Sequence, residues 1–212
     1  ALELLQGRTV HARVTNESAE IESPAAVFPG VSGSISFWDG SHEIQGASAS
    51  DLESQSSLVL IPPGSADRWK ESVSVVEVPS PRTAMVLFCS TFFPGRLKSG
   101  IAPSASVSGD AALGRDVFVD HGAVIGAASV GARTQIGANV VVADGVSIGE
   151  DCIIGPNTTI GNVGFGYVRD ESGFPHPFPH VGSVRIGDRV HVGANACIDR
   201  GALSNTEIED DV

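Results

Sequence analysis

An aliphatic residue recurs at every sixth position through much of the second half of this chain. The series lies at Val130, Ile136, Val142, Ile148, Ile154 and Ile160, and after an interruption at Ile186, Val192 and Ile198. The next residue is usually glycine, and the fourth residue on is small or β-branched. A period of six is neither the 3.6 of a helix nor the 2 of a strand. It is typical of a β-solenoid, in which each coil covers the open edge of the coil before it.

The same phase begins at Ile101 and slips by one residue between Ile125 and Val130. An ordinary β-sandwich is the alternative, but sandwich strands recur irregularly, at roughly 8–12 residues. The residues of the fourth slot, such as Thr134 and Cys152, are small enough to point inward beside the aliphatic ones. We therefore predict a solenoid over residues 100–212, interrupted once by an inserted loop at 162–185.

Residues 1–99 show no repeat. Apolar runs at 35–38, 57–62 and 73–79 predict strands, and residues 82–93, bounded by Pro81 and Pro94, predict a short buried helix. The chain is long enough for two modest domains. We predict a small α/β domain over residues 1–99, with the solenoid following it.

The composition narrows the class of protein. Hydrophobic residues make up 42% of the chain and charged residues 18%, which suits a folded protein. There is no apolar stretch as long as the ~20 residues of a membrane span and no secretory signal, so we expect a soluble, intracellular protein.

The net charge of −12 disfavours binding to nucleic acid or anionic lipid. Cys89, Cys152 and Cys197 are scattered, which favours core packing over disulfides or metal.

The inserted loop, residues 162–185, is rich in aromatic residues, prolines and histidines. Solenoid insertions emerge as loops on one face, and long loops in compact domains are usually functional. We expect it to contact a substrate or another subunit. A structural flap without a ligand role is the alternative.

Three stretches together resemble a known family. Residues 164–167 read Gly-Phe-Gly-Tyr, residues 179–195 run from Pro-His-Val-Gly to Gly-Ala-Asn, and residues 198–203 read Ile-Asp-Arg-Gly-Ala-Leu. They resemble the UDP-3-O-(3-hydroxyacyl)glucosamine N-acyltransferases of lipid A biosynthesis. The resemblance is weaker before Gly100, where it rests on residues 30–37 and on the Phe-Phe-Pro ending at Pro94.

The resemblance implies a left-handed parallel β-helix assembled as a cytoplasmic homotrimer, with active clefts between subunits. The implied reaction is attack by the 2-amino group of a UDP-3-O-acyl-glucosamine on a 3-hydroxyacyl thioester held by acyl carrier protein. An imidazole would act as general base and a backbone N–H would stabilise the oxyanion. Neither a metal nor a redox cofactor is implied, only the carrier's phosphopantetheine arm.

The resemblance also suggests binding residues. They are Phe37 and Trp38 for the uracil base, Phe165 and Tyr167 in the groove, His176 and His180 near the sugar nucleotide or carrier, and Asp199 and Arg200 across a subunit interface. Each set has a structural alternative. Phe165 and Tyr167 could pack on the solenoid, His176 and His180 could fix a turn, and Asp199 and Arg200 could form an ion pair at a corner.

The chain departs from the family in two places. The family's uridine site reads Phe-x-x-Asn-x-x-Tyr, whereas here Gly40 and Glu43 replace the Asn and the Tyr. The family's catalytic His lies beyond the position matching Val212, so no catalytic residue can be assigned. We expect either a fragment, with the solenoid incomplete at its C-terminal end, or a truncated relative.

Other readings remain open. His121 and His191 occupy outward slots, where either could substitute for the base or simply be exposed. Trimeric zinc enzymes also use hexad solenoids, but the histidines of this chain lack suitable spacing. Residues 164–167 lack the Lys and helix start of a phosphate loop.

Acyl carrier proteins are acidic and usually bind to a basic patch on their partner, and this acidic sequence shows no such patch. The alternative functions are another sugar-nucleotide N-acyltransferase, or a non-catalytic trimeric assembly module.

Overall fold

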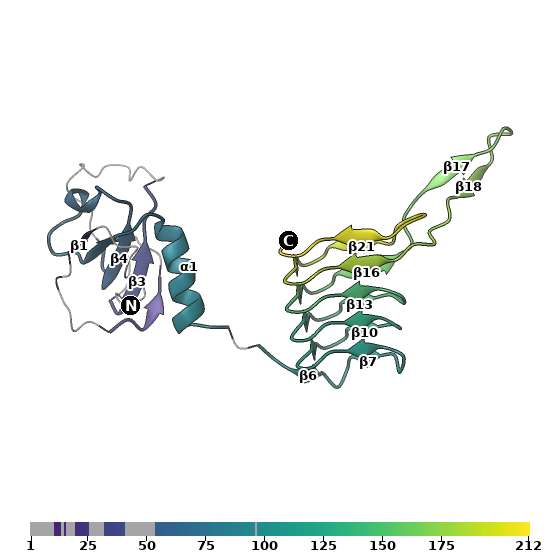
Figure 1. Cartoon of the computed structure of the whole chain (residues 1–212), viewed down its shortest axis with the longest axis horizontal. Helices are drawn as coiled ribbons and strands as arrows, with labels where there is room; N and C mark the ends of the chain where they lie inside the picture. Colours follow the sequence, from purple (N-terminus) through teal and green to yellow (C-terminus); the bar gives the residue numbers. More distant parts are fainter. Residues whose placement is uncertain (1–10, 14, 16–19, 26–31, 41–53, 96) are drawn as a thin grey trace. The chain divides into compact units, whose positions relative to one another are not determined.

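The computed structural model describes residues 11–13, 15, 20–25, 32–40, 54–95 and 97–212. Contacts divide the chain into two compact units, residues 1–95 and residues 96–212. Figure 1 shows the elements of each unit. Among the described residues, no helix is both long enough and apolar enough to cross a membrane.

The first unit is a five-stranded sheet in the order β1-β5-β4-β3-β2. Its strands are β1 (His11–Arg13), β2 (Ser23–Pro24), β3 (Ser34–Phe37), β4 (Leu58–Ile61) and β5 (Val75–Glu77). Strands β2 to β5 are parallel neighbours, and β1 is antiparallel to β5. The predicted runs correspond to β3, β4 and β5, whereas the two short edge strands carry little pattern of their own.

Helix α1 (Pro81–Phe92) covers one face of this sheet. Pro81 occupies its first turn, where no backbone N–H is required, and the Ser80 hydroxyl accepts a hydrogen bond from the Thr83 N–H. Ala84, Met85 and Phe88 pack on strand residues of one face, while the other face is covered by the 3₁₀ turn η2 (Ala66–Arg68) and its neighbours. The predicted helix and the mixed α/β fold are confirmed.

The second unit is a left-handed parallel β-helix, as predicted. Its walls are three five-stranded sheets, and each coil contributes one short strand to each wall (Figure 1). The first wall contains β6 (Gly100–Ile101), β9 (Phe118–Val119), β12 (Gln135–Ile136), β15 (Ile153–Ile154) and β20 (His191–Val192). The second contains β7 (Ser106–Val107), β10 (Val124–Ile125), β13 (Val141–Val142), β16 (Thr159–Asn162) and β21 (Cys197–Asp199). The third contains β8 (Ala112–Leu113), β11 (Ser129–Val130), β14 (Ser147–Ile148), β19 (Val184–Ile186) and β22 (Thr206–Ile208).

The hexad residues fill the interior of the β-helix. Val119, Ile136 and Ile154 are stacked on one wall and are almost completely buried. Thr134 and Cys152, from the small slot, are also buried, and the Thr134 hydroxyl accepts a hydrogen bond from the Cys152 N–H. The inward placement of both slots explains why the sequence repeats every six residues.

Several hexad glycines are required by the close stacking of coils. A Cβ on Gly149 would collide with the backbone of Gly187 in the next coil, and one on Gly187 would lie 2.8 Å from the Asp210 nitrogen. The repeated glycine therefore has a steric cause at the corners where a following coil stacks on it.

Two predictions about the β-helix were wrong. The coils are interrupted twice, because residues 200–205 form a second, shorter loop between β21 and β22. This loop was missed since Ala202 fits the small slot of the hexad. Of the three cysteines, Cys152 is buried and Cys89 is half-buried against the core of the first unit, as predicted, but Cys197 is exposed. Cys197 lies at an outward position of β21, where no core is available.

Candidate functional site

The inserted segment leaves the β-helix at the end of β16 and forms a hairpin. Its strands, β17 (Tyr167–Arg169) and β18 (Pro175–Pro177), pair antiparallel and project beyond the coils near β16 and β21 (Figure 1). Almost all of its side chains are exposed. The predicted loop is therefore an ordered projection from one corner.

A bulge in β16 creates the point of departure. The parallel register with β21 shifts between Ile160 and Asn162, and Gly161 has a φ of +88°. A Cβ on Gly161 would also collide with Val146. Bulges redirect the strand that carries them, and only glycine combines this backbone angle with so little space.

Arg200 fastens this bulge. Its Nε donates to the Gly161 carbonyl at 2.8 Å and its Nη2 to the Asp144 carbonyl at 3.3 Å, and its backbone N–H donates to the Asn162 carbonyl. No ion pair joins Arg200 to Asp199 in the described part of the chain, so the structural alternative, an ion pair at a corner, is not formed. The guanidinium instead connects three segments at one corner.

The second loop holds the returning limb of the hairpin. Val181 and Gly182 donate backbone hydrogen bonds to the carbonyls of Ala202 and Gly201, and Ser183 donates to the Asn205 side chain at 3.0 Å. A Cβ on Gly182 would collide with the Ser204 carbonyl. The loop missed by the sequence analysis thus positions the limb that carries His180.

His180 and Asp199 come together beside Gly164. The Cβ position of Gly164 lies 2.8 Å from His180 Nε2 and 3.5 Å from Asp199 Oδ2. His180 Nδ1 lies 2.9 Å from the Phe178 carbonyl, which can only accept, so Nδ1 carries the proton of the neutral ring. The other nitrogen, Nε2, is then an acceptor that faces the same space as the carboxylate.

The two aromatic residues of the exit strand pack on each other. Phe165 is 95% exposed and Tyr167 57%, and their ring centroids lie 5.2 Å apart. In the part of the chain that the structure describes, neither ring stacks on His180 or His176. The structural alternative, packing of these rings on the solenoid, is not formed, and the predicted role in a groove stays a prediction.

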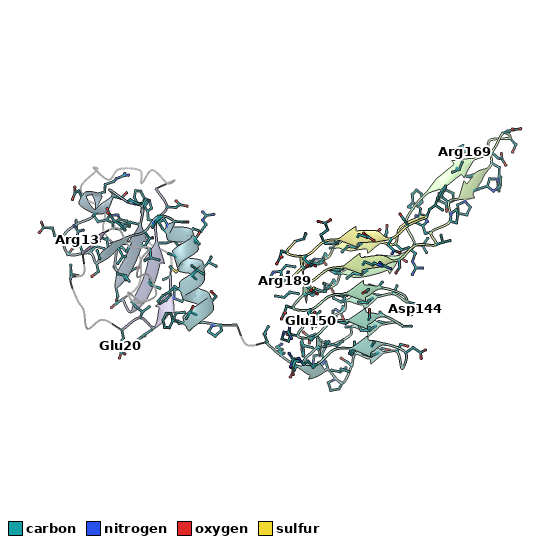
Figure 2. All side chains as sticks on the ribbon, in the orientation of Figure 1. Arg13, Glu20, Asp144, Glu150, Arg169 and Arg189 are labelled. Carbon is teal, nitrogen blue, oxygen red and sulfur yellow. The ribbon has the colours of Figure 1, made fainter. Side chains whose placement is uncertain are left out.

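The tip of the hairpin is organised by Asp170. Its Oδ1 accepts from the Ser172 hydroxyl, the Ser172 N–H and the Phe174 N–H, and its Oδ2 lies 2.9 Å from His176 Nε2. These bonds, led by the one from the Ser172 hydroxyl, lower the pKa of Asp170 to about 2. Arg169, which Figure 2 labels on the hairpin, donates a hydrogen bond to the Gly173 carbonyl. His176 therefore helps to fix a turn, which was the structural alternative.

In the first unit, Phe37 and Trp38 point to opposite faces of the sheet. Phe37 is half-buried with the Arg82 guanidinium 5.9 Å from its ring centroid, and Arg82 pairs with Asp39. Trp38 is only 3% exposed and packs in the core cluster that includes Trp69. A base could not stack on Trp38 without opening that cluster. Gly40 has a φ of +83°, and Glu43 lies outside the described residues.

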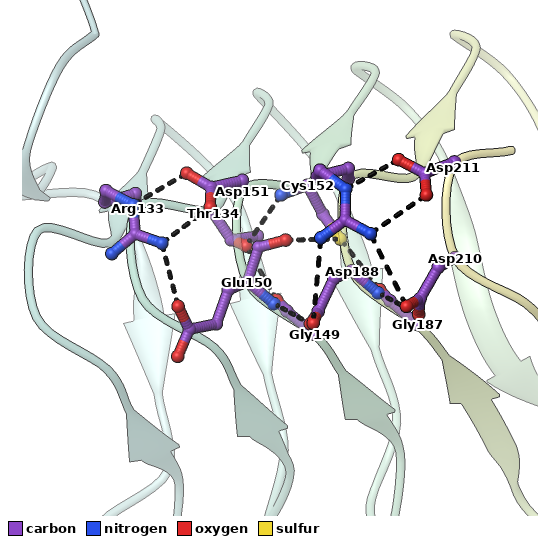
Figure 3. Close-up of polar contacts among 11 residues, drawn as sticks. Arg133, Thr134, Gly149, Glu150, Asp151, Cys152, Gly187, Asp188, Asp210 and Asp211 are labelled. Atoms are coloured by element: carbon purple, nitrogen blue, oxygen red, sulfur yellow. Dashed lines mark hydrogen bonds and ion pairs between the residues drawn. The ribbon is translucent and has the colours of Figure 1, made fainter.

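A charged corner runs along the β-helix (Figure 3). Arg133 bonds both Asp151 and Glu150, and Arg189 bonds both oxygens of Asp211. The hydrogen bonds from Arg133 and Arg189 lower the pKa of Asp151 and Asp211, respectively. All of these side chains are satisfied by one another, so the corner is a structural feature.

Two further histidines, His121 and His191, lie on the β-helix outside the hairpin. His121 bonds the Ser104 hydroxyl at 2.8 Å, and His191 is exposed on β20. No group of three or more potential metal ligands occurs among the residues that the structure describes. Both histidines face outward, as the sequence predicted.

Comparisons with known proteins agree with this architecture. Residues 127–162 match the bacterial transferase hexapeptide family (six repeats), and residues 183–212 match the hexapeptide repeat of succinyl-transferase. The β-helix therefore contains two segments that are similar to the hexapeptide repeats of these transferases.

The relatives are more specific and confirm the predicted resemblance. The chain is 40% identical to UDP-3-O-acylglucosamine N-acyltransferase 2 of Legionella pneumophila (strain Paris) over 66% of this chain and 46% of the relative. It is 54% identical to UDP-3-O-acylglucosamine N-acyltransferase of Shewanella oneidensis over 30% of this chain and 18% of the relative. The chain thus spans less than half the length of these relatives. A perosamine N-acetyltransferase from Caulobacter crescentus, 18% identical over 89% of this chain and 94% of its own, has a TM-score of 0.31, too low to support a functional argument.

Proposed function

We propose that the protein to which this chain belongs is a cytoplasmic N-acyltransferase of lipid A biosynthesis. It transfers a 3-hydroxyacyl group from acyl carrier protein to the 2-amino group of a UDP-3-O-acyl-glucosamine. The amine nitrogen forms the amide bond, the thioester bond breaks, and the proton of the amine is taken up by a base. The phosphopantetheine thiol of the carrier is the leaving group.

The observation that carries this proposal is the 40% identity to a UDP-3-O-acylglucosamine N-acyltransferase across 159 residues. That alignment is longer than the 113 residues from Gly100 to Val212, so it cannot rest on the hexads alone. Hexad solenoids serve many acyl donors and acceptors, whereas the relatives share one acceptor in their names. Identity beyond the repeat therefore favours that acceptor.

We further propose a homotrimer. One row of aligned outward residues in the second wall is uncharged, and Asp199 at the end of β21 is the charged exception beside it. The row is Ser106, Val124, Val141, Thr159 and Cys197. Val124 and Val141 expose 45% and 38% of their surface. The third wall instead carries Arg185 and Glu207 at outward positions. Exposed apolar surface of this kind marks an interface, and three-fold packing around a three-sided coil would bury it.

A second candidate is a related sugar-nucleotide N-acyltransferase that uses another acceptor. The observation that favours it is the first unit, where Trp38 is buried and Gly40 offers no polar side chain for a uracil base. The two candidates differ in the nucleotide sugar and the acyl donor that they accept.

The test is an acyl-transfer assay on the protein translated from its complete gene. It is mixed with 3-hydroxyacyl-acyl carrier protein and UDP-3-O-acyl-glucosamine, and mass spectrometry follows the product while thiol release follows the carrier. An amide product that requires both substrates supports the proposal. Transfer only to a different amino sugar, or only from acyl-coenzyme A, would favour the second candidate. Light scattering of the same protein measures the oligomeric state.

A further inference from the structure

Two hydrogen-bond acceptors face one small space at the base of the hairpin. His180 Nε2 comes from the returning limb and the Asp199 carboxylate from β21, and Gly164 on the outgoing limb leaves the space open. No hydrogen bond or ion pair of either acceptor is found within the part of the chain that the structure covers. The Thr206 hydroxyl donates to the backbone carbonyl of Asp199 and leaves its carboxylate free.

The chemistry of the pair selects its ligand. A bare imidazole nitrogen and a carboxylate can only accept hydrogen bonds, so the ligand must donate. Hydrogen bonds in which one partner is charged are stronger than neutral ones, which favours an amino or ammonium group over a hydroxyl. A metal ion is less suitable, because these two residues have no third protein ligand among the described side chains.

The pair is also held in place. Arg200, the residue after Asp199, donates a hydrogen bond to the Gly161 carbonyl in the bulge. The second loop accepts hydrogen bonds from the residues that follow His180. The Phe178 carbonyl fixes the orientation of the His180 ring. Side chains that are oriented before a ligand arrives lose less freedom on binding.

We propose that His180 and Asp199 bind the amino group of the acceptor sugar and give the site its preference for an amino sugar. This inference rests on the proposed function, since it assigns residues to the acceptor of that reaction. His180 and Asp199 act as binding and positioning residues. They orient the amine through its N–H groups, which leaves the nitrogen lone pair directed away from both acceptors.

The experiment compares two nucleotide sugars that differ at one position. Isothermal titration calorimetry measures the Kd of UDP-glucosamine, which carries an amine, and of UDP-glucose, which carries a hydroxyl there. We expect the native chain to bind the amino sugar about tenfold more tightly, the scale of one charge-assisted hydrogen bond. Asp199→Asn and His180→Ala should each bring the ratio close to one with little change in the Kd of UDP-glucose.

Two further variants separate binding from folding. Gly164→Ser removes neither acceptor but fills the space between them, so it should also abolish the preference. His180→Gln keeps an acceptor on a similar stem and should retain most of it. His191→Ala and Asp110→Asn are matched controls on exposed residues of the β-helix, and they should leave the ratio unchanged. Circular dichroism melting checks that each variant is folded.

The outcomes are distinct. A preference that survives in folded Asp199→Asn and His180→Ala overturns the inference, as does equal binding of the two sugars by the native chain. In both cases uridine nucleotides still bind, so the proposed function stands. If neither nucleotide sugar binds, the choice of a UDP-sugar acceptor is wrong and the inference falls with it.

Discussion

Arg133 and Asp151 occupy the same corner of successive coils and are joined by two hydrogen bonds, Nε to Oδ1 at 2.7 Å and Nη2 to Oδ2 at 2.6 Å. Both have positive φ, at +61° and +55°. Asp tolerates this conformation, but Arg rarely adopts it. The same alternation continues with Arg189 and Asp211. The ion pairs thus occur where the backbone is least favourable for a long side chain.

Replacing both members of the first pair should cost less than the sum of the single replacements. Arg133→Gln leaves Asp151 and Glu150 without the guanidinium that bonds both, and Asp151→Asn leaves Arg133 with one carboxylate. We expect both to lower the melting temperature, with a coupling that shrinks as salt rises because exposed charges are screened. A double-mutant cycle in low and high salt measures it. Strict additivity at low salt would show that the pair contributes nothing.

Gly149→Ala should destabilise the β-helix by about 2 kcal/mol or more, because the added methyl group would overlap the backbone of the next coil. Gly109→Ala is the control, since its methyl group would meet nothing within 4 Å although the next coil covers β7. That control should stay within about 0.5 kcal/mol of the native chain. Urea unfolding followed by far-ultraviolet circular dichroism measures both. Equal effects would contradict the steric explanation of the hexad glycine.

Arg200→Ala should lower the free energy of unfolding by about 1–3 kcal/mol, since it leaves the carbonyls of Gly161 and Asp144 without their donor. Arg185→Ala, which removes the same charge from an exposed position of β19, should have a much smaller effect. Chemical unfolding measures the difference. Hydrogen exchange should also show that the Asn162 region loses protection only in the first variant.

The turn of the hairpin should loosen in acid. The pKa of Asp170 falls from its ordinary 3.8 to about 2 in the folded chain, so its ionised form stabilises the turn. That stability is fully present above about pH 4 and is lost as the pH falls toward about 2. Nuclear magnetic resonance of the Ser172 and Phe174 amides should follow this loss. Asp170→Asn should flatten the dependence, and an unchanged profile in that variant would exclude the carboxylate as its cause.

The Cys152 thiol should resist alkylation in the native chain. Burial raises the pKa of this thiol, and the thiolate is the reactive form. We expect iodoacetamide to modify Cys152 only when urea unfolds the β-helix, which peptide mass mapping can follow. Rapid labelling under native conditions would indicate that the coils open locally around Cys152.

The repeat could be predicted from the sequence because the buried positions of each coil accept only certain residue types. Positions such as Ile136 and Ile154 must be aliphatic, since each stacks on the same slot of the next coil. The helix was predictable from Ser80, Pro81 and the apolar run that follows. The hexad period gives the position of each residue's neighbour in the next coil, and the start of the helix depends only on residues adjacent in sequence.

The site was less predictable, because it depends on contacts between segments with no shared pattern. His180 and Asp199 were identified as candidates, but their convergence at Gly164 depends on the bulge at Gly161 and on the second loop. Arg200 appeared free to meet a substrate, whereas it bonds backbone carbonyls that carry no sequence signal. Trp38 appeared available for stacking because the turn that covers it is distant in sequence.

Ile148, Ile186 and Ile208 stack in register on one wall even though a hairpin and a second loop separate them along the chain. Contacts between uninterrupted coils join residues 17 or 18 apart, while those across the hairpin join residues 38 apart. The entropy of closing a flexible loop grows slowly, at about 0.6 kcal/mol for each doubling of its length. A corner of this β-helix can therefore gain a long segment, and with it new side chains for binding, at a small entropic penalty to the coils on either side.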